Sequence, residues 1–220
     1  KTNLWRAWRL QSKLGSRSIA PDMAPSRKSS EPWHDDARQA VKVLREGGIL
    51  LHATDTVWGL ACDATNDDAV KRLNELKSRH PEHPVLVLVA DEGHVEELVP
   101  DVPEAAWDLM EHADRPTTVV YPEGRGVSSL LLGSNGSLAI RCIRDPYSAY
   151  VIRGLGKPMA STSANVTGGP TPKGFRDVPT VLREGVDHVS THRQQEAAGA
   201  GQPSMMVAFD AAGRFSFIRK

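Results

Sequence analysis

The chain has 220 residues, which is enough for one domain with its own hydrophobic core. Its 27 basic and 27 acidic side chains balance, which argues against nucleic-acid binding through bulk positive charge but leaves room for a local basic pocket. Apolar runs such as 85–90 are too short to cross a membrane, and two distant cysteines suit a reducing compartment, so we expect a cytoplasmic protein.

Residues 1–33 differ from the rest of the chain. They hold seven Lys and Arg residues against Asp22 and Glu31, and Ser, Pro and Gly interrupt any helical period. This composition predicts a disordered basic extension ahead of a domain over 34–220. A transit peptide is one interpretation of the extension, and sequence upstream of a start at Met23 is the one we favour.

From residue 34 the pattern becomes globular, with helices and strands in turn. Asn66 can cap a helix, Gly47-Gly48 can end one, and Asp145-Pro146 can begin one. The predicted helices cover 35–46, 67–77, 103–112, 145–154 and 177–184. The predicted strands cover 49–53, 85–90, 117–121, 138–143, 158–161, 204–210 and 214–218, the last two as a hairpin.

Both kinds of strand connection occur in this pattern. Strands that alternate with helices indicate parallel pairing, whereas the hairpin-like pairs indicate antiparallel pairing. We therefore predict a single α/β domain with a mixed, twisted sheet. The segment 192–203 is rich in Gln, Ala and Gly, and we expect a mobile loop there that serves as a lid.

Common nucleotide-binding and metal-binding motifs are missing from the sequence. Residues 154–158 resemble a phosphate loop superficially, but Pro158 stands where Ser or Thr is required and the first Gly is misplaced. His80 and His83 flank Pro81-Glu82, and the prolines prevent a helical pair of metal ligands, so we expect no structural metal. A bound nucleotide would therefore need a less common arrangement.

Three polar clusters accompany predicted elements. The first, 53–60, places two Thr hydroxyls and a carboxylate after a strand, where they can bind a small polar ligand or satisfy a turn. The second, 77–79, places Lys and Arg at a helix end, where cations commonly offset the helix dipole. The third, 161–169, offers hydroxyls, an amide and N–H groups that suit either phosphate oxygens or a polar turn.

Taken together, the clusters resemble those of one family. The order and spacing of Thr54-Asp55-Thr56-Val57-Trp58-Gly59-Leu60, Lys77-Ser78-Arg79 and Thr162-Ser163-Ala164-Asn165 are similar to those of the YrdC-like family. The resemblance extends over residues 34–220 and implies an open twisted mixed sheet with a large, basic, concave surface. It also implies the synthesis of threonylcarbamoyl-AMP from ATP, L-threonine and bicarbonate. The extra C-terminal domain of longer family members is not expected here.

The resemblance also assigns roles to individual residues. Lys77 and Arg79 are expected to be catalytic and to bind the phosphates of ATP, because cations neutralise the repulsion between two reacting anions. The other expected ATP contacts are Thr118, Ser163, Asn165 and Arg219, and the expected threonine contacts are Thr54, Arg141 and Ser204. Mg²⁺ is expected to arrive with ATP. The product would pass to the machinery that transfers it to tRNA, and weak RNA binding is a further expectation.

Several positions depart from the family pattern. Ala53 replaces a Pro, Ala61 replaces a common Gly, and the segment with Arg115 replaces a Pro-Gly-Pro-x-Thr sequence. His83 stands where many members carry Lys or another polar residue, and a neutral His would weaken a phosphate site. Two alternatives to the synthase stay open: a paralogue without activity that binds nucleotide or RNA, and a relative that transfers carbamoyl groups.

Overall fold

The computed structural model describes residues 31–78, 85–196 and 201–219. Most of the predicted extension (1–30), the segment with Arg79 and His83, and residues 197–200 of the predicted lid lie outside the described residues. The strands are β1 (Leu50–His52), β2 (Gly59–Asp63), β3 (Leu86–Val89), β4 (Thr117–Tyr121), β5 (Leu138–Cys142), β6 (Met159–Ser163), β7 (His188–Val189), β8 (Met205–Phe209) and β9 (Phe215–Arg219). The helices are α2 (His34–Arg45), α3 (Asp67–Leu76), α4 (Glu92–Leu98), α5 (Glu104–His112), α6 (Pro146–Leu155) and α7 (Thr180–Gly185), with short 3-10 turns at η1 (Ser129–Leu131) and η2 (Phe175–Asp177).

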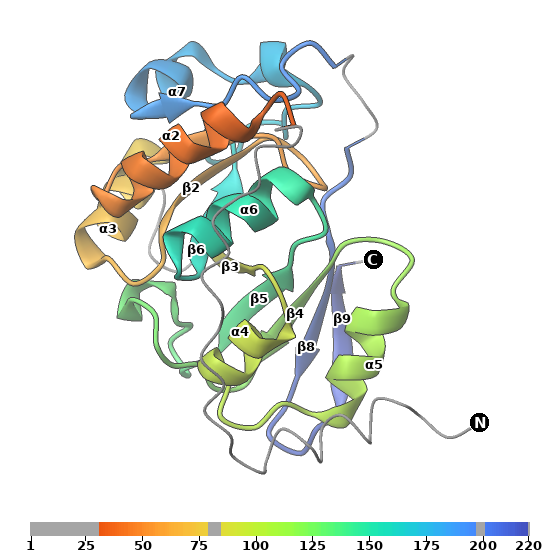
Figure 1. Ribbon diagram of the computed structural model, residues 1–220. Coiled ribbons are helices and arrows are strands. Elements are labelled where there is room, and N and C mark those ends of the chain that lie inside the picture. Colours follow the sequence, from red (N-terminus) through yellow and green to blue (C-terminus); the bar gives the residue numbers. More distant parts are fainter. Residues whose placement is uncertain (1–30, 79–84, 197–200, 220) are drawn as a thin grey trace, which may run out of the picture. The chain divides into compact units, whose positions relative to one another are not determined.

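The described residues form a single α/β domain around one mixed, twisted sheet of nine strands (Figure 1). The strand order is β7-β1-β2-β6-β3-β5-β4-β8-β9. The pairs β1–β7, β3–β5 and β4–β8 are parallel, and the other neighbours are antiparallel. The predicted fold class is therefore confirmed, and so is the hairpin of β8 and β9.

Local sequence signals explain where several helices begin and end. The side chain of Asn66 accepts a hydrogen bond from the Ala69 amide (3.1 Å), and the side chain of Asp145 accepts one from the Ser148 amide (2.8 Å). Each caps the first turn of a helix, α3 and α6 respectively, where backbone N–H groups have no partner within the helix. Gly156 ends α6 with a φ of 73°, a conformation that glycine adopts without strain.

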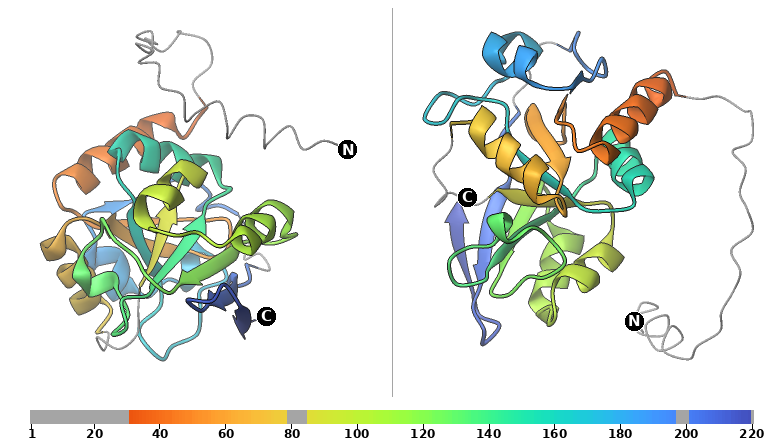
Figure 2. Two further views of the ribbon diagram at one scale, coloured as in Figure 1. Left: turned by 90° about the horizontal axis from the view of Figure 1, so that it is seen from below. Right: turned by 90° about the vertical axis from the view of Figure 1, so that its left-hand side faces the viewer.

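The sheet is covered on both faces, but unequally. Val87 and Val89 on β3 pack into the larger core with α3, α4 and α5, whereas Leu88 between them packs into a second core with α2 and α6. This alternation is the period of two that a strand imposes on its side chains. Helices α2 and α6 lie side by side on one face of the sheet (Figures 1 and 2), and together they cover only part of that face.

Two strands, one α-helix and the 3-10 turn η1 were missed in the sequence. β2 begins inside the cluster at 53–60 and ends after it. All five of its residues are buried, so no alternation of polar and apolar residues marks it as a strand. Helix α4 and the two-residue β7 are too short to show a period. The prediction of a helix over 177–184 was partly wrong, because a separate 3-10 turn ends at Asp177 and α7 begins after Pro179.

None of the helices in the described ranges combines the length and the apolar composition that a membrane span requires.

Candidate substrate cavity

The uncovered part of the sheet face forms a cavity of about 560 Å³. Along β6, Met159 packs under α2 and α6, while Ser161 and Ser163 further along the same face line the cavity. Along the neighbouring β5, Ala139 and Arg141 line it in the same way. The floor is therefore made where the strands carry small or polar side chains instead of large apolar ones, and its volume suits a small-molecule ligand.

The described lining of the cavity is basic. Its residues come from the loop after β1, the end of α3, the loop after β6, and the strands β2, β3, β4, β5, β6, β8 and β9. They include the cations Lys77, Arg141 and Arg219, and no Asp or Glu stands among the lining residues in the described ranges. This arrangement favours an anionic ligand.

Lys77 is buried, not exposed at the helix end. Its side chain is 3% exposed, and its ammonium group donates to the backbone carbonyl of Ser163 (2.6 Å), to the carbonyl of Asn165 and to the Asn165 side-chain oxygen (3.2 Å). Its own carbonyl accepts a hydrogen bond from the Thr167 hydroxyl (2.8 Å). The end of α3 is thus joined to a segment almost 90 residues later by one buried cation.

The segment after β6 is a turn held by its own polar groups. The Ser163 hydroxyl donates to the Asn165 side-chain oxygen at 2.5 Å, and the Asn165 amide donates to the carbonyls of Val166 (3.1 Å) and Gly169 (2.8 Å). Ser163, Asn165 and Thr167 all line the cavity. Two of the expected ATP contacts, Ser163 and Asn165, are thereby brought into direct contact with Lys77.

The loop of residues 54–57 is organised by the hydroxyl of Thr54. This hydroxyl donates to the Val57 carbonyl (2.7 Å) and accepts from the amides of Thr56 (3.1 Å) and Val57 (3.2 Å). The Thr56 hydroxyl lies 2.9 Å away, and either hydroxyl can be the donor of this contact. Thr54 lines the cavity, but its hydroxyl makes hydrogen bonds within the turn. Of the two uses considered for the cluster at 53–60, this is the one in which the polar groups satisfy a turn.

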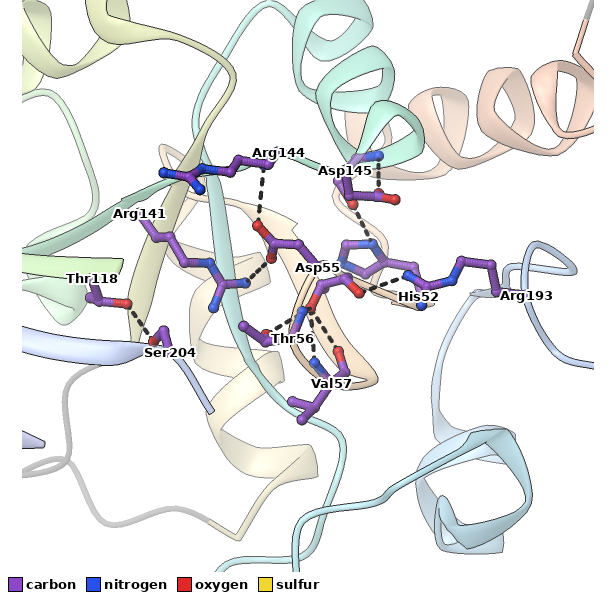
Figure 3. Close-up of polar contacts among 12 residues, drawn as sticks. His52, Asp55, Thr56, Val57, Thr118, Arg141, Arg144, Asp145, Arg193 and Ser204 are labelled. Carbon is purple, nitrogen blue, oxygen red and sulfur yellow. Dashed lines mark hydrogen bonds and ion pairs between the residues drawn. The ribbon is translucent and has the colours of Figure 1, made fainter. Parts of the chain in front are cut away.

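Asp55 connects this loop to β5 (Figure 3). Its carboxylate lies 3.2 Å from the guanidinium of Arg141 and accepts a hydrogen bond from the Arg144 amide (3.1 Å). Arg141 is 4% exposed, and its Nε–H is buried without a hydrogen-bond partner in the described structure. Burial lowers the pKa of Arg141 from its usual value, the charge of Asp55 opposes this shift, and the charge of Arg219 adds to it.

Thr118, an expected ATP contact, does not line the cavity. It is fully buried on β4, where its hydroxyl lies 2.7 Å from that of Ser204. Arg219 donates to the Ser204 carbonyl (2.9 Å) and to its hydroxyl (3.3 Å). Ser204 and Arg219 do line the cavity. The geometry therefore makes Thr118 a support for Ser204. Arg115 is exposed, and its carbonyl accepts a hydrogen bond from the Thr117 hydroxyl.

The structure brings most of the expected site residues together. Seven of them line one cavity: Thr54, Lys77, Arg141, Ser163, Asn165, Ser204 and Arg219. Arg79 lies outside the described residues. Thr118 is not among the lining residues and contacts Ser204, which is. Sequence reasoning missed Arg193, whose guanidinium donates to the Thr54 carbonyl at 2.8 Å. No sequence motif indicates a role for Arg193, because it follows a strand of two residues and lies in a segment rich in Gln and Ala.

A second polar network lies between α2, α6 and β7. Asp36 accepts hydrogen bonds from Tyr147 (2.7 Å), His188 (3.0 Å), Ser190 (2.7 Å) and the Thr191 amide (3.2 Å). Burial opposes the ionisation of Asp36, but these hydrogen bonds outweigh it and hold its pKa well below the usual range. The network fixes the segment after β7 to the helices that cover the sheet.

His52 is fully buried beneath α6. Its Nδ1 lies 3.2 Å from the Ser148 hydroxyl, and its Nε2 is buried without a hydrogen-bond partner in the described structure. Burial lowers the pKa of His52 to about 4, although the charge of Asp145 acts in the opposite direction. His52 is therefore neutral near pH 7.

The described residues contain no group of three or more His, Cys, Asp or Glu side chains placed to hold a metal ion.

Comparison with known proteins gives three findings. Residues 42–220 match the family model Sua5_yciO_yrdC, described as "Telomere recombination". The threonylcarbamoyl-AMP synthase of Hahella chejuensis is 32% identical over 171 residues, which cover 77% of this chain and 91% of that protein. Sua5 of P. abyssi, solved in complex with L-threonine, is similar with a TM-score of 0.69 and 26% identity, over 79% of this chain and 50% of that one. This chain thus corresponds to about half of that Sua5.

A further solved structure, that of E. coli YciO, has a TM-score of 0.71 at 21% identity and covers 87% of this chain and 91% of that chain. At this level of identity the likeness concerns the fold alone.

Proposed function

The chain belongs to the Sua5/YciO/YrdC family, and from that premise we propose that it synthesises L-threonylcarbamoyl-AMP from L-threonine, bicarbonate and ATP with release of pyrophosphate. The product would be the activated precursor for threonylcarbamoyl-adenosine in tRNA, consumed by a separate transferase. The observation that carries the proposal is the meeting of Lys77, Ser163 and Asn165 in one cavity with Arg141.

In this reaction the protein mainly positions the substrates, and it forms no covalent bond with them. The amine of threonine adds to bicarbonate, and with loss of water this gives a carbamate. A carboxylate oxygen of the carbamate then attacks the α-phosphorus of ATP, and the bond from that phosphorus to the bridging oxygen breaks as pyrophosphate leaves. Two anions must approach each other, so fixed positive charge lowers the barrier.

The basic lining of the cavity supplies that charge. Lys77 and the polar turn at Ser163 and Asn165 form one wall, which we assign to the phosphates of ATP. Arg141 is paired with Asp55 beside Thr54, and we assign these residues together with Ser204 to threonine and its carbamate. Arg219, which is fixed by the carbonyl of Ser204, completes the nucleotide side. Mg²⁺ would arrive with ATP as part of the substrate and would supply further positive charge to its phosphates.

Release of pyrophosphate tests this assignment. Purified protein with ATP and Mg²⁺ is expected to release pyrophosphate only when L-threonine and bicarbonate are both present. Serine in place of threonine and omission of bicarbonate are the matched controls. Binding of ATP without any pyrophosphate under these conditions would contradict the synthase and would favour a paralogue that only binds nucleotide or RNA.

A further inference from the structure

The loop of residues 54–57 is anchored to the rest of the molecule at two places. At Asp55 it is held by Arg141 and by the Arg144 amide, both on the β5 side. On the opposite side the backbone carbonyl of Thr54 accepts a hydrogen bond from Arg193 (Figure 3). The two anchors fix the loop from both sides, and the second has no counterpart among the residues expected from the sequence.

Arg193 is itself held in one orientation. Its Nη1 donates to the Thr54 carbonyl at 2.8 Å, and its Nε lies 2.8 Å from both carboxylate oxygens of Glu196. Its φ is +64°, and Ser78 is the only other non-glycine residue with a positive φ in the described ranges. Residues other than glycine persist in this region only where the surroundings impose it. Arg193 combines this uncommon backbone conformation with its hydrogen bond to Thr54.

The segment that carries Arg193 rests on a fixed base. The Ser190 hydroxyl and the Thr191 amide are bonded to Asp36, and the Gln194 amide donates to the Ser190 carbonyl at 2.7 Å. The ring of His192 stacks on Tyr147 with centroids 5.1 Å apart and planes 8° apart. Arg193 therefore transmits the position of helices α2 and α6 to the loop that holds Thr54.

We propose that Arg193 is a positioning residue that sets the conformation of the loop of residues 54–57 and thereby the affinity for threonine. The inference rests on the proposed function, which assigns this side of the cavity to threonine. Arg193 is not among the described residues that line the cavity, so it acts through the Thr54 carbonyl and not on the substrate. The alternative is a surface ion pair with Glu196 that supports only the local turn.

Kinetics of the full chain separate these two explanations. Arg193→Ala is expected to raise the KM for threonine about tenfold, as expected for the loss of one charge-assisted hydrogen bond, with the KM for ATP unchanged. Arg193→Lys, which keeps a donor but loses the fork, should recover part of the affinity. Arg193→Gly should behave like Arg193→Ala while easing the backbone. Arg214→Ala removes an exposed pair with Asp210 in the β8–β9 turn and is the matched control.

Hydrogen exchange gives a readout that does not depend on turnover. The amides of Thr56 and Val57 are bonded to the Thr54 hydroxyl, so loss of the Arg193 anchor should speed their exchange, whereas Arg214→Ala should not. Faster exchange with a selective rise in the KM for threonine supports the proposal. Unchanged exchange, an unchanged KM for threonine, or equal changes in both KM values overturns it. If the wild type releases no pyrophosphate, the proposed function fails, and exchange alone decides whether Arg193 positions the loop.

Discussion

At the scale of single residues, Lys77 changes most between sequence and structure. A lysine at a helix end is usually a solvated charge, but here the ammonium group is surrounded by carbonyl oxygens from the turn after β6. Oxygen acceptors stabilise a buried cation, and the cation in turn keeps these acceptors satisfied. Lys77 therefore belongs both to the fold and to the cationic wall of the cavity.

Replacement of Lys77 by Met tests this dual role. The change keeps the chain length but removes the charge and leaves the backbone carbonyls of Ser163 and Asn165 without the Lys77 donor, so we expect a loss of about 1–3 kcal/mol in the free energy of unfolding. Nucleotide affinity should fall roughly tenfold to a hundredfold. Calorimetric titration with a non-hydrolysable ATP analogue and thermal melts measure the two effects. Lys71→Met, an exposed change on the same helix, is the control, and equal behaviour of both variants would remove Lys77 from the site.

His52 makes stability depend on pH. Its pKa in the fold is about 4, below the ordinary value of 6.5, so the unfolded chain binds the proton more tightly. The contribution of His52 is complete above about pH 6.5 and is lost as the pH falls toward 4, by at most about 1.4 kcal/mol per pH unit. Denaturant melts from pH 7.5 to 5 measure it. The variant His52→Gln should show a shallower slope, and an unchanged slope would mean that His52 does not control it.

At the scale of elements, close packing of α2 on α6 depends on a glycine. A Cβ at Gly154 would lie 2.8 Å from Cγ2 of Val41, a β-branched side chain that has few alternative rotamers. We expect Gly154→Ala to cost about 1–3 kcal/mol of stability, although alanine favours a helix by about 1 kcal/mol. The double variant with Val41→Ala should recover part of that loss in denaturant melts. Strictly additive losses would show that the two residues do not compete for space.

How well the sequence predicted each element follows from local signals. Strand β4, the β8–β9 hairpin and helices α3 and α6 have caps, turns or β-branched runs that act locally, and they appear as predicted. Strand β2 is buried on both faces between β1 and β6, and its first residue, Gly59, lines the cavity. Such a strand has no alternating pattern, since both of its faces are buried.

The candidate site likewise has a part that the sequence predicted and a part that it did not. Lys77, Ser163 and Asn165 stand in motifs that are dense in polar residues, and the fold places them together as expected. The support of Ser204 by Thr118 could not be predicted, because strand pairing between β4 and β8 sets it. The hydrogen bond from Arg193 to the Thr54 carbonyl could not be predicted either, because Arg193 has a positive φ that its residue type does not indicate.

At the scale of the whole molecule, the sheet face that packs against α2 and α6 also forms the cavity. Its large apolar side chains hold α2 and α6, and its small and polar ones form the floor of the cavity beside them. The Asp36 network and Arg193 then connect those helices to the loop of residues 54–57. If Arg193 positions this loop as we propose, the packing of α2 and α6 affects substrate binding through these contacts.

The composition of the chain before residue 23 gives a prediction. This part is rich in Lys and Arg and has no apolar periodicity of the kind that packs into a core. Deletion of residues 1–22 should therefore leave the melting temperature and pyrophosphate release unchanged. A large fall in the melting temperature of the truncated chain would show that the extension packs on the domain.

The central claim is that the cavity joins carbon from bicarbonate to threonine and to the α-phosphate of ATP. Mass spectrometry of a reaction with ATP, Mg²⁺, L-threonine and ¹³C-bicarbonate tests it most directly. The account predicts threonylcarbamoyl-AMP that carries the heavy carbon, formed by the wild type and strongly reduced in Lys77→Met. Well-folded protein that forms no such product over a range of pH, or a product without the label, would contradict it.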